Sequence, residues 1–555
     1  ATMPGRVVVQ WDKEDCADMG IVKVDLLGLG MMAVLEDSLK MIREYHAEEI
    51  DLGRLPANDP AVYAALQKAD TVGMFQVESR AQMSCLPRLR PKCFYDIVVQ
   101  VAIIRPGPIV GKMVHPYLKR RQGREAAECL HPSLEPVLAR TLGVPLFQEQ
   151  LLRMAMIAAG FTGGEAEELR RALGFKRSEA RMKEVEIKLR RGMQAKGITG
   201  ETQDKIAQSI ASFALYGFPE SHAASFALIA YASAWLKCHY LAAFTAAMLN
   251  NQPMGFYNPA TLVKDAQRHG LKCKAIDLTR SDWNCTLEKI SGGGFALRLG
   301  LRYVKGLREV IALEIVRQRE LRKFTSIDDL KQRIPDIQKS ELTALAEIGA
   351  LNFISNRRAI HRRDALWQVE CAARPAGPLL DTPETVPDKM EAEFSSDLRE
   401  KNADQEIGAP GDSPLLPMTA GERLAADFRG TGITVGPHPM AYRRAEMQKQ
   451  GVRRAIELAK LPDGMHVSVA GAVIARQRPG TAHGFVFLSL EDETGIANAI
   501  ITPQLFEMDQ TVVVHHSFLL VEGTLQNQEN VISVKAQRIQ PLSIMNAETA
   551  SHDFH

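Results

Sequence analysis

The chain has 555 residues, which is too long for a single hydrophobic core and predicts three to five domains. Hydrophobic residues make up 46% and charged residues 24%, the composition of a globular rather than a disordered protein. The 68 Lys and Arg nearly balance the 66 Asp and Glu, so a basic signature of the whole chain is excluded and any nucleic-acid surface must come from local segregation of charge.

Cysteine usage and hydropathy indicate a soluble, cytoplasmic protein. The eight cysteines include no CxxC pair, which excludes the common zinc layouts and suits reduced thiols. The start at Ala1 lacks the build of a signal peptide. The most apolar helical stretch, residues 223–236, is shorter than the roughly 20 residues that cross a bilayer. We therefore expect no membrane span.

The first segment is expected to be the end of a domain that begins before Ala1. Residues 7–9 and 21–25 are predicted strands, residues 11–20 are acidic and irregular, and residues 28–45 carry helical periodicity. Two short strands cannot bury their faces alone, so further strands are expected upstream.

The middle of the chain is predicted to be helical over residues 59–248, with breaks at the Pro and Gly residues of 105–108 and 217–219. Residues 302–365 are predicted to form short helices with tight turns. Residues 372–437 are rich in Pro, Gly, Asp and Glu and predict a linker or a loosely ordered connection.

After Met465 the hydrophobic period changes to two, which predicts strands. Five strands interrupted by one short helix are typical of an OB-like barrel, a fold often used on single-stranded nucleic acid. The predicted strands are residues 467–473, 484–490, 495–501, 518–525 and 531–539, with the helix at 503–508.

Asp25 is the first candidate for chemistry, because it closes an apolar strand where a metal ion can approach. Phosphoryl transfer needs divalent ions held by carboxylates. The alternative is that Asp25 caps the following helix. One Asp also cannot build a two-metal site.

Two runs of basic side chains are candidates for nucleic-acid or nucleotide binding. Residues 112–124 hold five basic side chains and no acid, and residues 170–191 hold nine basic side chains against three acids. Such stripes attract phosphates through counterion release, although a solvated helix face remains the alternative for each run.

Two Gly-containing turns are further candidates. The break at 217–219 precedes an apolar helix whose free N–H groups favour an anion, and Ser221 and His222 can donate there; the alternatives are an ordinary N-cap and a packed ring. Residues 302–308, with Lys305 and Gly306, match a helix-hairpin-helix turn that holds DNA phosphate. Arg308 stands where the usual hairpin has a second Gly.

These segments, in this order, resemble the C-family DNA polymerases, the family of the α-subunit of bacterial DNA polymerase III and its error-prone relatives. The resemblance runs along nearly the whole chain. It rests on VKVDLLGL at 22–29, GMFQVES at 73–79, RPGP at 105–108, QEQ at 148–150, RRALG at 170–174, SHAA at 221–224 and WLKCHY at 235–240.

The resemblance implies roles for individual residues. Asp25 would be a magnesium ligand in the palm, and Lys23 would help with phosphate charge. The nucleotide triphosphate or the template–primer backbone would be contacted by Arg105, Arg170, Arg171, Lys176, Ser221 and His222.

Several departures from the family pattern point to the error-prone branch and to a fragment. No motif with the family's other two catalytic Asp residues precedes Asp25, and the N-terminal PHP-type domain is absent. Pro219-Glu220 stands where replicative members typically carry Asn-Lys, and Phe226 where they often show Tyr. No convincing clamp-binding pentapeptide occurs in residues 365–460, and the chain ends soon after the OB-like strands.

The expected architecture is multidomain α+β. It comprises the C-terminal part of the palm (1–34), helical fingers (35–290), a helix-hairpin-helix region (291–365), a linker and connecting segment (366–460) and an OB-like domain (461–545). The expected function is error-prone, template-directed DNA synthesis past lesions with Mg²⁺ and deoxynucleoside triphosphates. A sliding clamp would be reached through an accessory Y-family-like protein. The alternatives are a non-catalytic DNA-binding scaffold and a replicative α-subunit.

Overall fold

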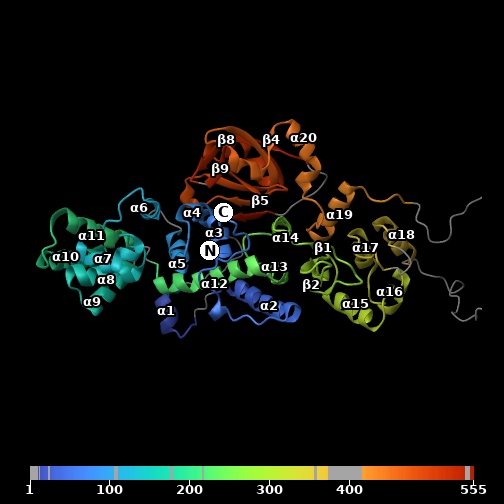
Figure 1. Ribbon diagram of the computed structural model, residues 1–555, viewed down its shortest axis with the longest axis horizontal. Coiled ribbons are helices and arrows are strands. Elements are labelled where there is room, and N and C mark those ends of the chain that lie inside the picture. The colour runs from blue at the N-terminus through green and yellow to red at the C-terminus, as the bar shows by residue number, and fades with distance from the viewer. Residues whose placement is uncertain are drawn as a thin grey trace, which may run out of the picture.

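The computed structural model describes most of the chain: residues 11, 13–22, 26–104, 110–174, 179–214, 218–354, 359–372, 415–529, 531–543 and 551–554. Figure 1 shows a central helical body with a helical lobe (α7–α11) at one end, short helices (α15–α18) at the other, and a β-barrel along one side. None of the helices in these described ranges has the length and apolar character needed to cross a membrane.

The body is organised around helix α12, which is rich in alanine. Ala223, Ala227, Ala230 and Ala234 are buried, and their small side chains let neighbouring helices approach closely. One hydrophobic core joins most of these helices. The body helices are α1 (Lys13–Asp18), α2 (Leu29–His46), α3 (Pro60–Gln67), α4 (Arg80–Leu89), α5 (Phe94–Ile103), α12 (Glu220–His239), α13 (Leu241–Asn250) and α14 (Pro259–Arg268).

The N-terminal expectations are met in part. The predicted helix at 28–45 is confirmed as α2. The prediction of irregular structure at 11–20 is wrong for Lys13–Asp18, which form α1. Residues 7–9 and 23–25 lie outside the described residues, and Ile21 and Val22 are not in a strand.

The lobe has a separate hydrophobic core, to which Met154, Met193 and Ile206 contribute fully buried side chains. It joins the body where Phe147 and Phe218 pair as a parallel β-bridge, after α6 and before α12. The helices of this region are α6 (Val110–Arg121), α7 (Glu135–Leu138), α8 (Gln148–Ala159), α9 (Gly163–Gly174), α10 (Glu179–Ala195) and α11 (Gly200–Ala214).

A small sheet and four short helices extend the core of the body, as the prediction of short helices over 302–365 anticipated. The sheet order is β1-β3-β2, with β1 parallel and β2 antiparallel to β3. The elements are β1 (Cys273–Lys274), β2 (Thr286–Lys289), β3 (Phe295–Arg298), α15 (Glu309–Leu321), α16 (Ile327–Arg333), α17 (Lys339–Glu347) and α18 (Arg362–Ala372).

The prediction of a linker over 372–437 is wrong for its last part. A capping box forms between Thr419 and Glu422 and starts a helix whose Leu424 and Phe428 are buried. Residues 373–414 lie outside the described ranges. The elements that lead to the barrel are α19 (Ala420–Thr431), α20 (Arg444–Lys449) and β4 (Val452–Arg453).

The C-terminal strands form the predicted OB-like barrel. Strands follow the order β5-β6-β7-β9-β8, and β8 pairs back with β5 to close the barrel. β7 and β9 are parallel, and a helix separates β7 from β8, as in an OB-fold. The elements are β5 (His466–Gln477), β6 (Val486–Glu491), β7 (Ile496–Ile501), α21 (Pro503–His515), β8 (Phe518–Gln528), β9 (Val531–Pro541) and β10 (His552–Phe554).

Candidate nucleic-acid and nucleotide interface

Gly28, which follows the predicted palm residues in the sequence, lies beside the middle of α12. Lys23 and Asp25 lie outside the described residues. Gly28, which precedes α2, has φ +96°, and a Cβ added there would lie 3.4 Å from the Phe75 ring and 3.9 Å from Ile229.

One face of α12 is open to solvent near this segment. Ser221, Ser225 and Leu228 are exposed, and their spacing puts them on one side of the helix. The His222 ring is half-buried, with its centroid 5.1 Å from that of Phe218 and 4.2 Å from that of Phe226. The structure thus places Ser221 and His222 together, with His222 packed among aromatic rings.

The N-terminus of α12 already carries one carboxylate. The backbone N–H of Glu220 donates to Glu149 Oε2 at 2.9 Å. The first intrahelical bond runs from Ala223 N to Pro219 O, so the N–H groups of Ser221 and His222 point beyond the helix. This end of α12 has the polarity that favours an anion, and Glu149 occupies part of it.

The same end of α12 joins the lobe to the body. Burial is the main cause of the raised pKa of the Tyr95 hydroxyl, and the negative charge of Glu220 raises this pKa further. The Arg140 guanidinium lies 3.9 Å from the centroid of the Tyr95 ring. Two backbone segments cross here as well, because Gln148 N donates to Phe218 O at 3.1 Å. Glu149 belongs to the QEQ motif at 148–150, but the sequence did not indicate its role as a helix cap.

The other basic residues predicted to contact phosphates in the fingers lie in parts of the chain, or have side chains, outside what the structure describes. Arg105 and Lys176 lie outside the described residues, and Arg170 and Arg171 fall within α9 at positions whose side chains also lie outside them.

The predicted DNA hairpin follows the 3₁₀ turn Leu301–Tyr303 and precedes α15. Gly306 has φ +85° in open surroundings, as a hairpin glycine requires. The backbone N–H of Lys305 donates to Gly430 O at 2.8 Å, and its Nζ donates to Phe428 O at 3.3 Å. Arg308 N donates to Glu341 Oε1 at 3.0 Å. Of this turn, Gly306 is therefore the residue best placed to approach a phosphate.

Basic side chains of the body meet the barrel. Arg80, the first residue of α4, donates to Leu488 O at 3.4 Å and to Ala499 O at 3.2 Å. Its guanidinium lies 4.7 Å from the centroid of the Phe487 ring. Burial lowers the pKa of Arg80 to about 10. Nothing local in the sequence indicated this contact, since its partners lie 408 and 419 residues away.

A buried polar network also connects barrel and body. Glu491, at the end of β6, accepts from Arg268 at 2.9 Å and from Thr261 at 3.3 Å. Burial raises the pKa of Glu491 to about 7 and lowers that of neighbouring Lys264 to about 8. These groups hold the barrel against α14.

Among the described residues, Asp70, Asp265 and His269 have ligand atoms within 4.8 Å of one another. However, the Lys237 ammonium lies 2.8 Å from Asp265 and 3.7 Å from Asp70. A buried ammonium already balances this charge, so the cluster is a structural ion-pair network.

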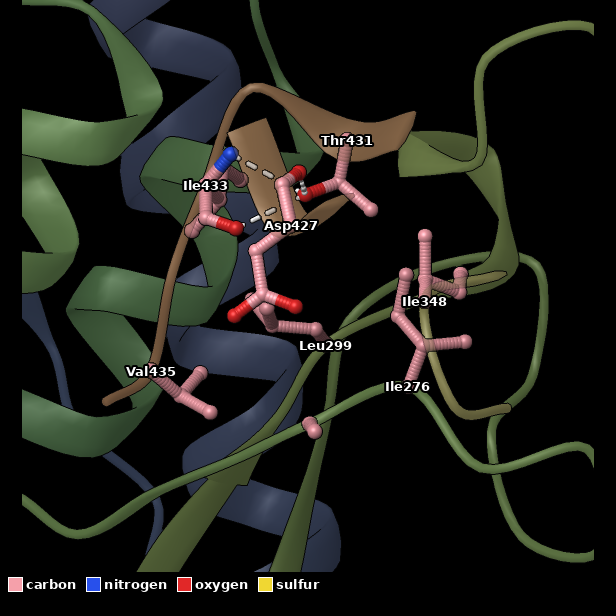
Figure 2. A pocket seen from close by; sticks show the side chains of 8 residues that line it. Ile276, Leu299, Ile348, Asp427, Thr431, Ile433 and Val435 are labelled. Atoms are coloured by element: carbon pink, nitrogen blue, oxygen red, sulfur yellow. Dashed lines mark hydrogen bonds between the residues drawn. The ribbon is translucent and has the colours of Figure 1, made fainter. Parts of the chain in front are cut away.

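A cavity under α19 is also structural. Figure 2 shows the Asp427 side chain among mainly apolar residues. Its carboxylate accepts from Arg362 at 2.7 Å and from Thr434 at 2.9 Å, and burial raises its pKa. This lining suits neither a nucleotide nor a DNA backbone. It comprises Ala275, Ile276, Leu299, Ile348, Asp427, Thr431, Ile433 and Val435.

Three family models match the chain in sequence order. They are the finger domain of the bacterial DNA polymerase III alpha subunit at residues 31–197, a helix-hairpin-helix motif at 270–360 and an OB-fold nucleic acid binding domain at 467–542. A chain with these three modules on this fold belongs to the bacterial C-family DNA polymerases.

Similar proteins place the chain in the error-prone branch of that family. It is 44% identical over 554 residues to error-prone DNA polymerase 2 of Rhizobium meliloti (strain 1021), covering 100% of this chain and 49% of the relative. It is 45% identical over 573 residues to error-prone DNA polymerase of Anaeromyxobacter sp. (strain K), covering 100% and 48%. The identity to error-prone DNA polymerase of Nocardia farcinica (strain IFM 10152) is 46% over 561 residues, covering 100% and 46%. The chain thus spans about half the length of these relatives.

Proposed function

We propose that this chain forms the fingers, helix-hairpin-helix and OB part of a polymerase that copies damaged DNA templates with low fidelity. The observation that carries the proposal is similarity over 100% of the chain to relatives named error-prone DNA polymerase. The substrates would be primer–template DNA and deoxynucleoside triphosphates, used in the cytoplasm.

Asp25, beside Lys23, would be one of the carboxylates of the polymerase site. This role is supported by the place of Asp25 in the VKVDLLGL stretch at 22–29, which resembles the palm motif of the family. A magnesium ion bound by Asp25 would neutralise charge on the phosphates and align them for attack.

The remaining site residues would hold phosphates. The N–H groups of Ser221 and His222 point out of the α12 N-terminus, which suits a triphosphate. Arg105, Arg170, Arg171 and Lys176 would neutralise phosphate charge on the triphosphate or on the template–primer. Gly306 and Lys305 would contact the DNA backbone at the hairpin. Recruitment to a sliding clamp through an accessory protein related to Y-family polymerases follows from the family resemblance.

A second candidate is a non-catalytic DNA-binding scaffold. Three nucleic-acid modules and a single candidate catalytic carboxylate in this sequence favour it for the chain on its own.

Replacing Asp25 in the whole polymerase tests whether this residue belongs to the catalytic site. D25N should abolish primer extension opposite an abasic site while leaving affinity for primed DNA within about threefold, because a metal ligand is lost and no phosphate contact is. D18N, at an exposed acidic position in α1, is the matched control and should extend normally. Extension by D25N at the control rate would show that Asp25 is a helix cap and not a metal ligand.

A further inference from the structure

Helix α12 has two faces with different surroundings. Ser221, Ser225 and Leu228 lie on the exposed face, which begins at the helix end where the triphosphate is proposed to bind. Another face of the same helix is buried against residues 71–78, which lie between α3 and α4. We call these residues the Phe75 loop.

Three side chains of α12 hold the Phe75 loop. The Phe226 ring meets the Phe75 ring edge to face, with 5.3 Å between the centroids. The Ser233 hydroxyl accepts from Phe75 N at 3.1 Å, and the Lys237 ammonium donates to Val72 O at 2.8 Å. Spacings of seven and four residues put these three side chains on one side of the helix. The loop is therefore held along about three turns of α12.

The Phe75 loop is held firmly enough to keep a strained backbone. Val77 N donates to Phe75 O at 2.8 Å, which closes a γ-turn around Gln76, and Gln76 has φ +64°. The Thr71 hydroxyl donates to Val77 O at 2.8 Å. A γ-turn with positive φ is strained, and such a residue persists only where its surroundings determine its conformation. The Phe75 ring therefore has little freedom to move relative to α12.

The tip of the Phe75 ring lies against the segment that leads into α2. A Cβ added at Gly28 would lie 3.4 Å from Phe75 Cζ, and Phe75 is only 8% exposed. Gly28 follows Asp25 by three residues in the sequence. One buried ring thus lies between α12, where the triphosphate is proposed to bind, and the start of α2, which follows the proposed catalytic carboxylate.

We propose that Phe75 is a positioning residue for nucleotide transfer. Its ring sets the separation between α12 and the start of α2, and through them the alignment of the bound triphosphate with the metal held by Asp25. This proposal rests on the proposed function. A displacement of about 1 Å between reacting groups can lower a rate about a hundredfold, so a buried ring affects the reaction without touching the substrate.

Single-turnover incorporation of one nucleotide by the whole polymerase, measured over a range of nucleotide concentrations, tests this role. F75L keeps an apolar side chain but removes the ring, and should lower the incorporation rate constant kpol about tenfold or more. The nucleotide Kd should stay within about threefold, because the N–H groups at the α12 N-terminus remain in place. S233A removes the acceptor of Phe75 N and should lower kpol about threefold.

Each variant has a matched control. Phe324 is also buried, at 2% exposed, in the same hydrophobic core, but it lies between α15 and α16. F324L should lower the melting temperature about as much as F75L and leave kpol unchanged. Ser38 is fully buried in α2, and its hydroxyl donates to Val34 O of the same helix. S38A should therefore also leave kpol unchanged.

A kpol of F75L or S233A equal to that of its control would overturn the proposal. A smaller burst amplitude or a weaker nucleotide Kd with unchanged kpol would also overturn it, because Phe75 would then only stabilise the fold or α12. If F75L does not fold, S233A decides. Failure of the proposed function would appear in the wild type, as absent primer extension, whereas failure of this inference appears only as variants that match their controls.

Discussion

The lobe and the barrel are both attached to the same body, but by different kinds of contact. Each has a hydrophobic core of its own. The lobe is joined through hydrogen bonds of the backbone: Phe147 and Phe218 form a β-bridge, and the N–H of Glu220 donates to the side-chain carboxylate of Glu149. The barrel is joined through side chains: Phe428 and Phe518 share an apolar cluster, Arg268 and Glu491 form a buried pair, and Arg88 pairs with Glu529 at the other side.

This difference determines what can move each unit. A backbone joint keeps its geometry as pH and salt change. Contacts between ionisable groups respond to both, and two groups beside α14 titrate near neutrality: burial raises the pKa of Glu491 to about 7 and lowers that of Lys264 to about 8. We therefore expect the position of the barrel on the body to change with pH and salt, and the position of the lobe to change less.

The largest expected effect comes from breaking the buried pair of the barrel. R268M leaves Glu491 without its cation and should destabilise the docked barrel by about 3 kcal/mol at pH 8. At pH 5 the carboxyl takes up a proton and the loss should be much smaller. Amide hydrogen exchange of β5–β9 is the measurement, because all four tryptophans lie outside the barrel.

R322M is the control for this prediction. Arg322 pairs with Asp329 at 2.8 Å, but its side chain is 69% exposed, so its removal should cost less than about 1 kcal/mol at either pH. Equal effects of R268M at pH 5 and pH 8 would contradict the assignment of the loss to the Glu491 charge.

The second prediction concerns the pH dependence of the docked barrel. The pKa of Glu491 is raised to about 7 from its usual value of about 4.3. Its contribution to stability is therefore full below about pH 4.3 and is lost as the pH rises through 7, by roughly 3 kcal/mol in total. E491Q should remove this slope. The measurement is amide hydrogen exchange of β5–β9 between pH 5 and pH 7. This pH range lies below the pKa of Lys264, so Lys264 stays charged throughout.

Burial also raises the pKa of Glu78 to about 7. Because Glu78 is present in both the wild type and E491Q, the difference in pH dependence between these two proteins comes from Glu491. A wild-type slope that persists in E491Q would show that another group controls the barrel.

The third prediction addresses the lobe, where packing rather than charge should decide stability. A Cβ at Gly192 of α10 would lie 2.2 Å from Ala159 O at the end of α8. G192A should therefore push α8 and α10 apart and cost about 1–3 kcal/mol in the lobe alone. Exchange of α8 and α10 should rise while that of the barrel stays unchanged. G164A is the control, because nothing lies within 4 Å of a Cβ at Gly164 in α9.

Much of the fold could be predicted from local patterns. Alternation along residues 467–539 predicted the barrel because the inward side chains of each strand must be apolar. Helix α19 was missed because the preceding residues 372–417 are rich in Pro and acidic residues, although the Thr419–Glu422 capping box was a usable signal.

The proposed site could be inferred from the sequence only where a motif carries it. Asp25, Ser221 and Gly306 stand in recognisable motifs, whereas Arg80 is an ordinary helix residue. Its contact with Phe487 depends on how two units separated by about 400 residues pack against each other, which no local pattern encodes.

The smallest expected effect is at the joint between lobe and body. Glu149 gives the first N–H of α12 an acceptor, and a carboxylate near a helix N-terminus gains from the dipole. The nearby carboxylate of Glu220 reduces this gain, so E149A should cost only about 1 kcal/mol. The amide of Glu220 should then exchange about fivefold faster, and E149Q, which keeps an acceptor, should fall between. E165A is the control: Glu165 accepts from Thr162 N inside the lobe, so its loss should leave exchange at Glu220 unchanged. Unchanged exchange at Glu220 in E149A would mean that the crossing of Phe147 and Phe218 holds the joint by itself. The lobe would then be held to the body by backbone contacts alone, whereas side-chain charges help to hold the barrel.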